Sequence, residues 1–185
     1  MRLMDHYLGS YQFSERHALD IPAPPHAVMP AVRSYDAGSD PFFRQMIALR
    51  ELPMRALGAL SGKKVNPSSF GMQNFTVLEQ QGDEELVFGL IGKFWQLDYG
   101  QHPFTTTAEF LAFDQPDFAK LTVGFQLEQL SDHRTRLVTE TRVHCLSGAA
   151  HKKFAPYWYL IRPVSGLIRQ RILSSIRRSV LTAAG

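Results

Sequence analysis

Residues 147–183 read SGAAHKKFAPYWYLIRPVSGLIRQRILSSIRRSVLTA, a run that contains no carboxylate. Its apolar residues recur at helical spacing and form one stripe, made up of Ile161, Val164, Ile168, Ile172, Ile176 and Val180. Such a stripe must lie against an apolar surface, so the run predicts a long amphipathic helix packed on the rest of the fold. Pro156 and Pro163 each remove a helix hydrogen bond, and we therefore expect a kink, or a short helix joined to a longer one.

The surface available to this helix is a β-sheet formed by the segments that precede it. Residues 11–21 alternate as a first strand, which Pro22 and the following prolines end. Residues 26–35 and 41–60 then predict two helices. Five further strands are predicted at 72–80, 85–95, 105–113, 119–130 and 134–145, with a short extra strand near 63–70 or 96–102. The turns between them are short, so neighbouring strands should pair antiparallel.

The alternation also assigns faces to some of these strands. In 119–130, Leu121, Val123, Phe125 and Leu127 share one face and polar residues fill the other, which predicts a sheet with one apolar side. In 134–145, two polar residues, Thr139 and Thr141, fall on the apolar face. The strand at 85–95 is apolar on both faces, so its register stays open.

These elements predict a single α+β domain over residues 1–185, a length that buries a sizeable core. The expected architecture is a curved antiparallel sheet of six or seven strands wrapped around the C-terminal helix, with two helices between the first and second strands. A bent sheet closed by one helix tends to leave a cavity between the two.

This element order resembles the START and polyketide-cyclase-like helix-grip superfamily (SRPBCC) over the whole chain. The segments that carry the resemblance are YQFSERH at 11–17, APP at 23–25, FGLIGKFW at 88–95, TETRV at 139–143 and Tyr157-Trp158. The resemblance implies a cavity under the helix that holds an apolar small molecule or lipid. Some members of the superfamily are cyclases, dehydratases or other enzymes, and the resemblance does not choose among these activities.

The candidate ligand-binding residues are those expected on the apolar faces. Six of them supply apolar walls or fill the space as ordinary core: Phe13, Phe110, Phe125, Leu127, Tyr157 and Trp158. Four are polar: Glu15, His17, Thr139 and Thr141. A buried Glu15 requires a partner, either His17 or an arginine from across the sheet, whereas a strand end open to water would require none. Glu109 raises the same question.

Charge is divided unevenly along the chain. Residues 1–140 contain 12 Lys and Arg against 17 Asp and Glu, while residues 141–185 contain 8 Lys and Arg and no acid. This pattern fits basic side chains that flank the helix stripe and pair with acidic sheet edges, so we expect no nucleic-acid partner. Weak contact with an anionic membrane surface is the alternative interpretation. The oligomeric state stays open.

Other classes of site lack sequence support. The seven histidines form no chelating pair, Cys145 is the lone cysteine, and no nucleotide or nucleophile motif occurs, so we expect no metal and no cofactor. No membrane-spanning run or signal peptide is recognised, which predicts a cytoplasmic protein.

Two functions are consistent with these residue patterns. The first is a binding or carrier protein for an apolar small molecule or lipid. The second is an enzyme of cyclase, dehydratase or hydrolase type in which Glu15 and His17 act as acid and base on such a ligand. The ligand and the pathway stay open.

Overall fold

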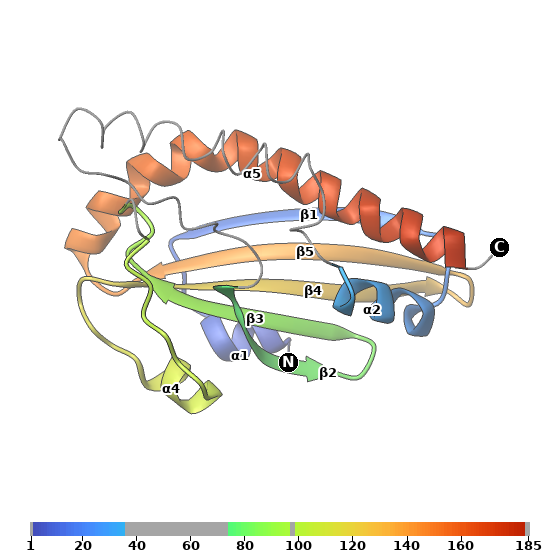
Figure 1. The fold of residues 1–185 in the computed structure, drawn as a ribbon, viewed down its shortest axis with the longest axis horizontal. Coiled ribbons are helices and arrows are strands. Elements are labelled where there is room, and N and C mark those ends of the chain that lie inside the picture. Colours follow the sequence, from blue (N-terminus) through green and yellow to red (C-terminus); the bar gives the residue numbers. More distant parts are fainter. Residues whose placement is uncertain (1, 36–73, 97–98, 184–185) are drawn as a thin grey trace.

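The computed structural model describes residues 2–35, 74–96 and 99–183. Its elements, in chain order, are α1 (Leu3–Leu8), β1 (Phe13–Ile21), α2 (Pro25–Arg33), β2 (Thr76–Gln81), β3 (Glu85–Gly92), α4 (Thr107–Ala112), β4 (Ala119–Ser131), β5 (Arg134–Cys145) and α5 (Gly148–Ala183). Figure 1 shows α5 lying along the sheet, with α2 beside its C-terminal end. The helix predicted at 41–60 and the extra strand predicted near 63–70 lie outside the described residues.

The described strands form one sheet in the order β1-β5-β4-β3-β2. Every neighbouring pair is antiparallel, and for β2–β3 and β4–β5, the pairs joined by short turns, this was the prediction. The strand predicted at 134–145 is confirmed with the same bounds as β5, and β4 extends one residue beyond the predicted strand. Because β1 pairs with β5, the first strand of the chain lies beside the last, and both edges of β5 are covered.

The terminal run forms one helix of 36 residues, α5, which contains both prolines. Figure 1 shows its axis bending near the N-terminal end, which confirms the predicted kink. The predicted stripe faces the sheet: Ile161, Ile168, Ile172, Ile176 and Val180 are buried, and Val164 is half-buried.

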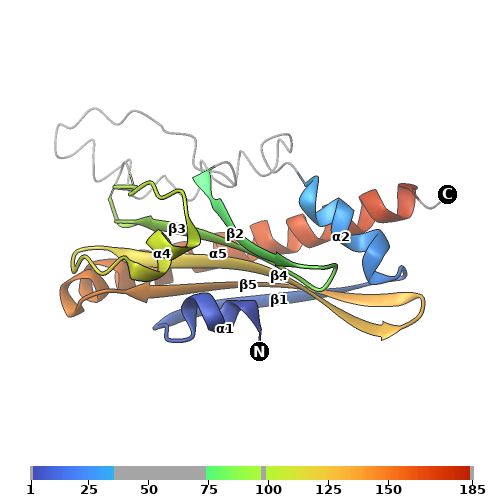
Figure 2. The same cartoon turned by 90° about the horizontal axis from the view of Figure 1, so that it is seen from below.

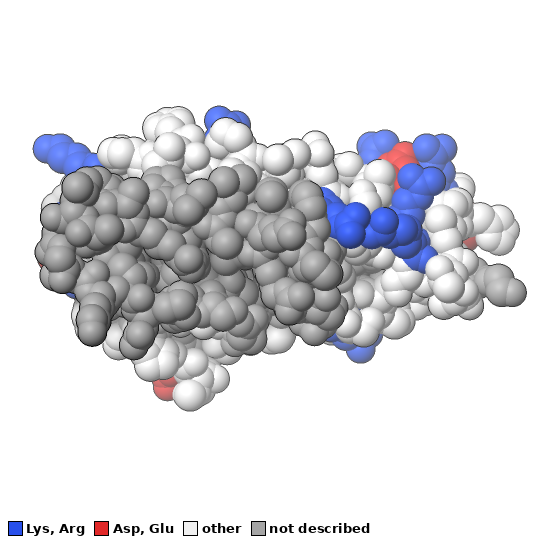
Figure 3. All heavy atoms as spheres, turned by 45° about the horizontal axis from the view of Figure 1, so that its top comes forward, with Lys and Arg blue, Asp and Glu red and all other residues white. Residues whose placement is uncertain are grey.

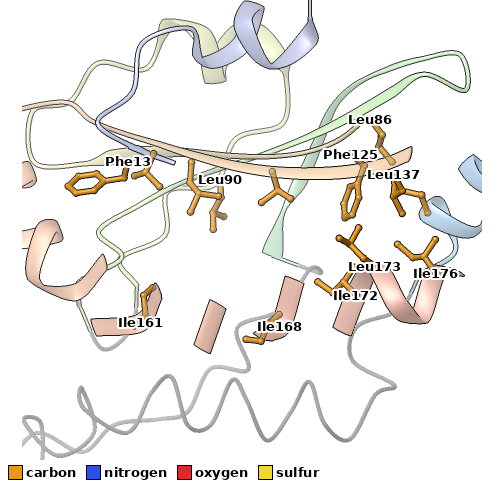
Figure 4. Packing of buried hydrophobic residues seen from close by; sticks show 14 of the residues in the cluster. Phe13, Leu86, Leu90, Phe125, Leu137, Ile161, Ile168, Ile172, Leu173 and Ile176 are labelled. Atoms are coloured by element: carbon orange, nitrogen blue, oxygen red, sulfur yellow. The ribbon is translucent and has the colours of Figure 1, made fainter. Parts of the chain in front are cut away.

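The main core lies between α5 and the sheet. Figure 4 shows Phe125 of β4 and Leu137 of β5 pointing toward Ile172, Leu173 and Ile176 of α5. Val28, Met29 and Val32 of α2 belong to the same cluster of buried side chains. The predicted faces of β1, β4 and β5 are therefore confirmed.

The prediction of a single apolar side is wrong, because a second apolar cluster covers the opposite face. Leu3, Met4 and Tyr7 of α1 pack there against Val87 and Ile91 of β3. Figure 2 shows α1 lying against the sheet on the side away from α5. The sequence pattern predicted no element before residue 11, so nothing was expected to cover this face. The helix explains why β3 is apolar on both faces.

The strand predicted at 105–113 is also wrong, because this segment contains α4. The Thr106 side chain accepts a hydrogen bond from the Glu109 N–H, and the Glu109 side chain bonds back to the Thr106 N–H, which forms a capping box. This reciprocal pair satisfies two backbone donors at the start of a helix and gives the segment a helical alternative to pairing with the sheet. Glu109 is therefore exposed, and its carboxylate accepts a hydrogen bond from the Thr105 N–H. It is not a buried carboxylate that needs a charged partner.

The described elements form an α+β helix-grip arrangement, a curved antiparallel sheet that holds a long C-terminal helix. Five strands are described, compared with the six or seven expected, because one predicted strand is α4. The described part of 96–102 contributes no strand. Among the described helices, none combines the length and the hydropathy that a membrane-spanning helix needs.

Candidate functional site

The pairing of β1 with β5 brings the four predicted polar residues together. Glu15 lies directly opposite Thr141, and His17 lies directly opposite Thr139. All four belong to the sheet face that packs against α5, on which their neighbours in β4 are apolar. On that strand Val123 is paired with Thr141 and Phe125 with Thr139. The register therefore places a small polar group within the main apolar core.

Glu15 and His17 are in direct contact. His17 Nε2 lies 2.7 Å from Glu15 Oε1. The Glu15 side chain is 9% exposed and the His17 side chain is 22% exposed. The predicted alternatives for Glu15 are thereby resolved: it is nearly buried, and its partner is the histidine two residues along the same strand face.

Gly166 of α5 lies over this pair. A Cβ atom at that position would lie 3.1 Å from Glu15 Oε1 and 3.6 Å from His17 Cε1. Glycine inside a helix costs about 1 kcal/mol relative to alanine, and here it allows the helix to approach a carboxylate closely. One turn further along α5, Arg169 Nη2 donates a hydrogen bond of 2.6 Å to Thr141 Oγ1. The polar group thus includes side chains of the sheet and of α5.

The Thr139 hydroxyl lacks a partner within the described part of the chain. Thr139 is fully buried, and its Oγ1 makes no hydrogen bond with any described residue. A buried hydroxyl left unpaired costs about 1–3 kcal/mol. Its place opposite His17 makes it available to a group that enters the α5 face.

The predicted apolar wall residues fall into two sets. Phe13, Tyr157 and Trp158 lie near the start of α5, where Phe154 joins them at ring-centroid distances of 5.0 to 5.9 Å. Phe125 and Leu127 lie on β4, on the face toward α5. Phe110 does not belong to this group. It lies on α4 and belongs to the second apolar cluster, on the sheet face opposite α5, because the segment that contains it is helical.

Sequence reasoning missed Gly166, Arg169 and Phe154 as members of this region. A glycine between Ile161 and Ile168 of the apolar stripe was the available signal, since it interrupts the face that packs on the sheet. From the sequence, Arg169 belongs only to the basic side chains expected to flank the helix stripe.

Two buried side chains with shifted pKa values, Cys145 and Lys120, belong to other parts of the sheet. Burial raises the pKa of the Cys145 thiol to about 12. Burial also lowers the pKa of Lys120, whose Nζ donates to the Leu111 carbonyl on the face opposite α5. Neither arrangement provides an activated nucleophile on the α5 face. No group of three or more metal-ligating side chains occurs among the described residues.

Comparison with known proteins yields likenesses of general arrangement alone. No protein-family profile and no curated protein sequence matches the chain. A solved structure of a conserved protein from Geobacillus kaustophilus is similar at 10% identity and a TM-score of 0.46, covering 92% of this chain and 97% of the other.

Two further solved structures are similar at lower TM-scores. The Zhui aromatase/cyclase from a Streptomyces species aligns at 10% identity and a TM-score of 0.34, covering 94% of this chain and 96% of its own. The lipid transfer and protein localization domain of human StarD13 aligns at 10% identity and a TM-score of 0.32. The alignment covers 94% of this chain and 79% of the other. The helix-grip arrangement follows from the strand order and the position of α5 in this chain itself.

Proposed function

We propose that the protein binds an apolar small molecule or lipid between α5 and the sheet. The observation that carries the proposal is a polar group, centred on Glu15, His17 and Thr139, within an otherwise apolar interface. Sites for small apolar ligands are lined mainly by hydrophobic side chains, with a few polar groups that fix the orientation of the ligand. An interface that only held the helix in place would be more stable with apolar residues at these positions.

The affinity in this proposal comes mainly from burial of the ligand's apolar surface. Each square ångström removed from water contributes about 25 cal/mol, so a ligand that buries a few hundred square ångströms binds without many polar contacts. The apolar surface would come from Phe125, Leu90 and Ile168, which lie on the facing layers of the main core. The polar group then fixes the orientation of the bound ligand.

The first experiment looks for a ligand that accompanies the protein. Native mass spectrometry of protein purified from the organism that encodes it should show an added mass that organic extraction removes. The extracted compound should then displace an environment-sensitive apolar dye from the stripped protein.

A surface variant distinguishes interior binding from binding on the outside of α5. Leu160 and Leu167 are exposed on α5, so the double variant L160Q/L167Q removes two apolar side chains from the outside of the helix and leaves the core intact. The proposal predicts unchanged dye affinity in this variant. Loss of dye binding, together with the absence of any co-purified compound, would contradict it.

The alternative function is an enzyme that acts on such a ligand. The contact of 2.7 Å between Glu15 and His17 favours it, since a carboxylate that holds an imidazole is a common acid–base arrangement. Once a substrate is identified, E15Q and H17Q should each lower kcat/KM by about 100-fold or more. Unchanged turnover in both variants would leave binding as the function. Location in the cytoplasm stays a prediction under either function.

A further inference from the structure

The contact between Glu15 and His17 determines what the second nitrogen of the imidazole offers to a ligand. An ionised carboxylate only accepts hydrogen bonds, so the His17 Nε2 atom, 2.7 Å from Glu15 Oε1, carries a hydrogen. In the neutral ring the other nitrogen, Nδ1, then has a free lone pair and is an acceptor. Within the described residues no hydrogen bond to His17 Nδ1 is found, and the side chain is not fully buried. With an uncharged ring, His17 therefore presents an acceptor nitrogen at Nδ1.

Thr139 offers the complementary group. It pairs directly with His17 across β1 and β5, an arrangement in which Cβ atoms lie about 4.5–5.5 Å apart. Its hydroxyl hydrogen has no described acceptor, although the residue is fully buried. A residue with a free donor and a residue with a free acceptor thus pair directly across β1 and β5, on the face that α5 covers.

We propose that His17 and Thr139 form the polar end of the ligand site and that the ligand carries a hydroxyl group, as an alcohol or a phenol. The hydroxyl oxygen accepts a hydrogen bond from Thr139 Oγ1, and the hydroxyl hydrogen is donated to His17 Nδ1. This inference rests on the proposed function, since it names the class of apolar ligand that the same site takes. A hydroxyl is the smallest group that satisfies both partners at once.

A carboxylate fits this pair less well than a hydroxyl. It has no hydrogen for His17 Nδ1, and it would place a second negative charge beside Glu15. Arg169 is the cation that α5 brings to this group, and its Nη2 donates a hydrogen bond to Thr141 Oγ1. Thr141 is two residues along β5 from Thr139 and lies on the same face. A carboxylate ligand is therefore the competing outcome that the experiment must distinguish.

The test compares three probes that share one apolar body: 2-naphthol, 2-methylnaphthalene and 2-naphthoic acid. Their affinities are measured by calorimetry or intrinsic fluorescence for the wild type, T139V and T122V. Thr122 provides the matched control, because its hydroxyl is equally buried and equally unpartnered within the described chain but lies on the opposite face of the sheet. Valine keeps the shape of threonine at both positions.

We expect 2-naphthol to be the tightest of the three probes in the wild type. The ratio of its affinity to that of 2-methylnaphthalene should fall about five-fold in T139V, the factor that one net hydrogen bond of about 1 kcal/mol gives. The ratio should be unchanged in T122V.

The possible failures are distinguishable. If the probes bind the wild type but T139V leaves the ratio unchanged, or if 2-naphthoic acid binds most tightly, the hydroxyl site is wrong and apolar binding stands. If no probe binds, the proposed function fails and this inference fails with it. A measurement without ligand gives an independent check: long-range nitrogen-15 spectra should show His17 protonated at Nε2 and unprotonated at Nδ1. The reverse tautomer, or a ring protonated at both nitrogens, would overturn the proposal.

Discussion

At the residue scale, Arg142 shows that the charge of the C-terminal part of the chain is not all at the surface. Its side chain is 4% exposed and lies on the β5 face away from α5. Nε donates to Glu140 at 2.6 Å, and Nη1 donates to Asp5 at 2.7 Å and to the Leu8 carbonyl at 3.2 Å. Burial opposes its charge, but the hydrogen bonds to Glu140 and Asp5 outweigh burial and raise the pKa of Arg142 above its ordinary value.

Replacing Arg142 should be costly because the carboxylate of Glu140 would stay nearly buried with less compensation. We predict that R142M lowers the free energy of unfolding by about 3 kcal/mol, the usual effect of breaking a buried ion pair from one side. Urea denaturation measures it. The control is R136M on the same strand, where the arginine is exposed and its partner is Asp20, so the loss should be far smaller. Equal losses would contradict this role of Arg142.

Cys145 should be protected from alkylation in the folded protein. Burial raises the pKa of its thiol to about 12, so almost no thiolate exists at pH 8. Iodoacetamide should label Cys145 only in urea. Between about pH 8.5 and 12 the unfolded thiol loses its proton and the folded one keeps it, so the wild type should lose stability relative to C145A as pH rises. Rapid labelling of the folded protein would show that the thiol is accessible.

At the element scale, α1 is attached to the back of the sheet through a buried carboxylate of β3. Glu85 accepts hydrogen bonds from the backbone N–H groups of Leu3, at 2.8 Å, and Met4, at 3.3 Å. These are donors of the first turn of a short helix, which have no partner within the helix itself. Glu85 therefore fixes where α1 begins.

Removing that carboxylate should destabilise α1 more than the rest of the fold. We predict that E85A lowers the free energy of unfolding by about 2 kcal/mol, as expected for hydrogen bonds to a charged group. Amide hydrogen exchange in α1 should speed up more than exchange in β4. The adjacent exposed residue provides the control, since E84A should change neither quantity appreciably. Unchanged α1 exchange in E85A would show that packing alone holds the helix.

Element prediction from sequence succeeded where one periodicity dominated. The alternation of β5 and the stripe of α5 were interpreted correctly because each face of those elements meets a single kind of environment. Prediction failed for α1, whose six residues are too few to show a helical period. It also failed for α4, where the Thr106 and Glu109 capping signal was present but the apolar residues around it were taken for strand alternation.

The candidate site was predicted in part for the same reason. Alternation alone placed Glu15, His17, Thr139 and Thr141 on one face, and the pairing of β1 with β5 brings them together. The contributions of Gly166 and Arg169 depend on how α5 is rotated and shifted against the sheet, which no local pattern encodes. Phe110 was misplaced because its segment was assigned the wrong secondary structure.

At the scale of the whole molecule, basic charge gathers at one end. Figure 3 shows Lys and Arg side chains collected near the end of the molecule where α5 terminates. Arg177 and Arg178 are exposed there, and no described carboxylate pairs with either of them. Lys153 does pair with Asp117, at 3.5 Å, so the expected pairing with acidic groups holds for only part of the helix.

The exposed arginines lead to a prediction about membranes that stays separate from the ligand site. Any binding to vesicles that contain phosphatidylserine should be weak and should vanish between about 0.01 M and 1 M salt, because the screening length falls from about 30 Å to about 3 Å. Sedimentation with vesicles measures it, and R177S/R178S should lower it further. Binding that resists salt would indicate an apolar mode of membrane contact instead.

The location of the ligand can be tested directly by photo-cross-linking with a diazirine-bearing long-chain alcohol, followed by residue-level mass spectrometry. We predict labels on the facing layers of α5 and the sheet, at residues such as Phe125, Thr139 and Ile168. Labels confined to the outer surface of α5, at Tyr159, Leu160 and Leu167, would contradict binding between the helix and the sheet.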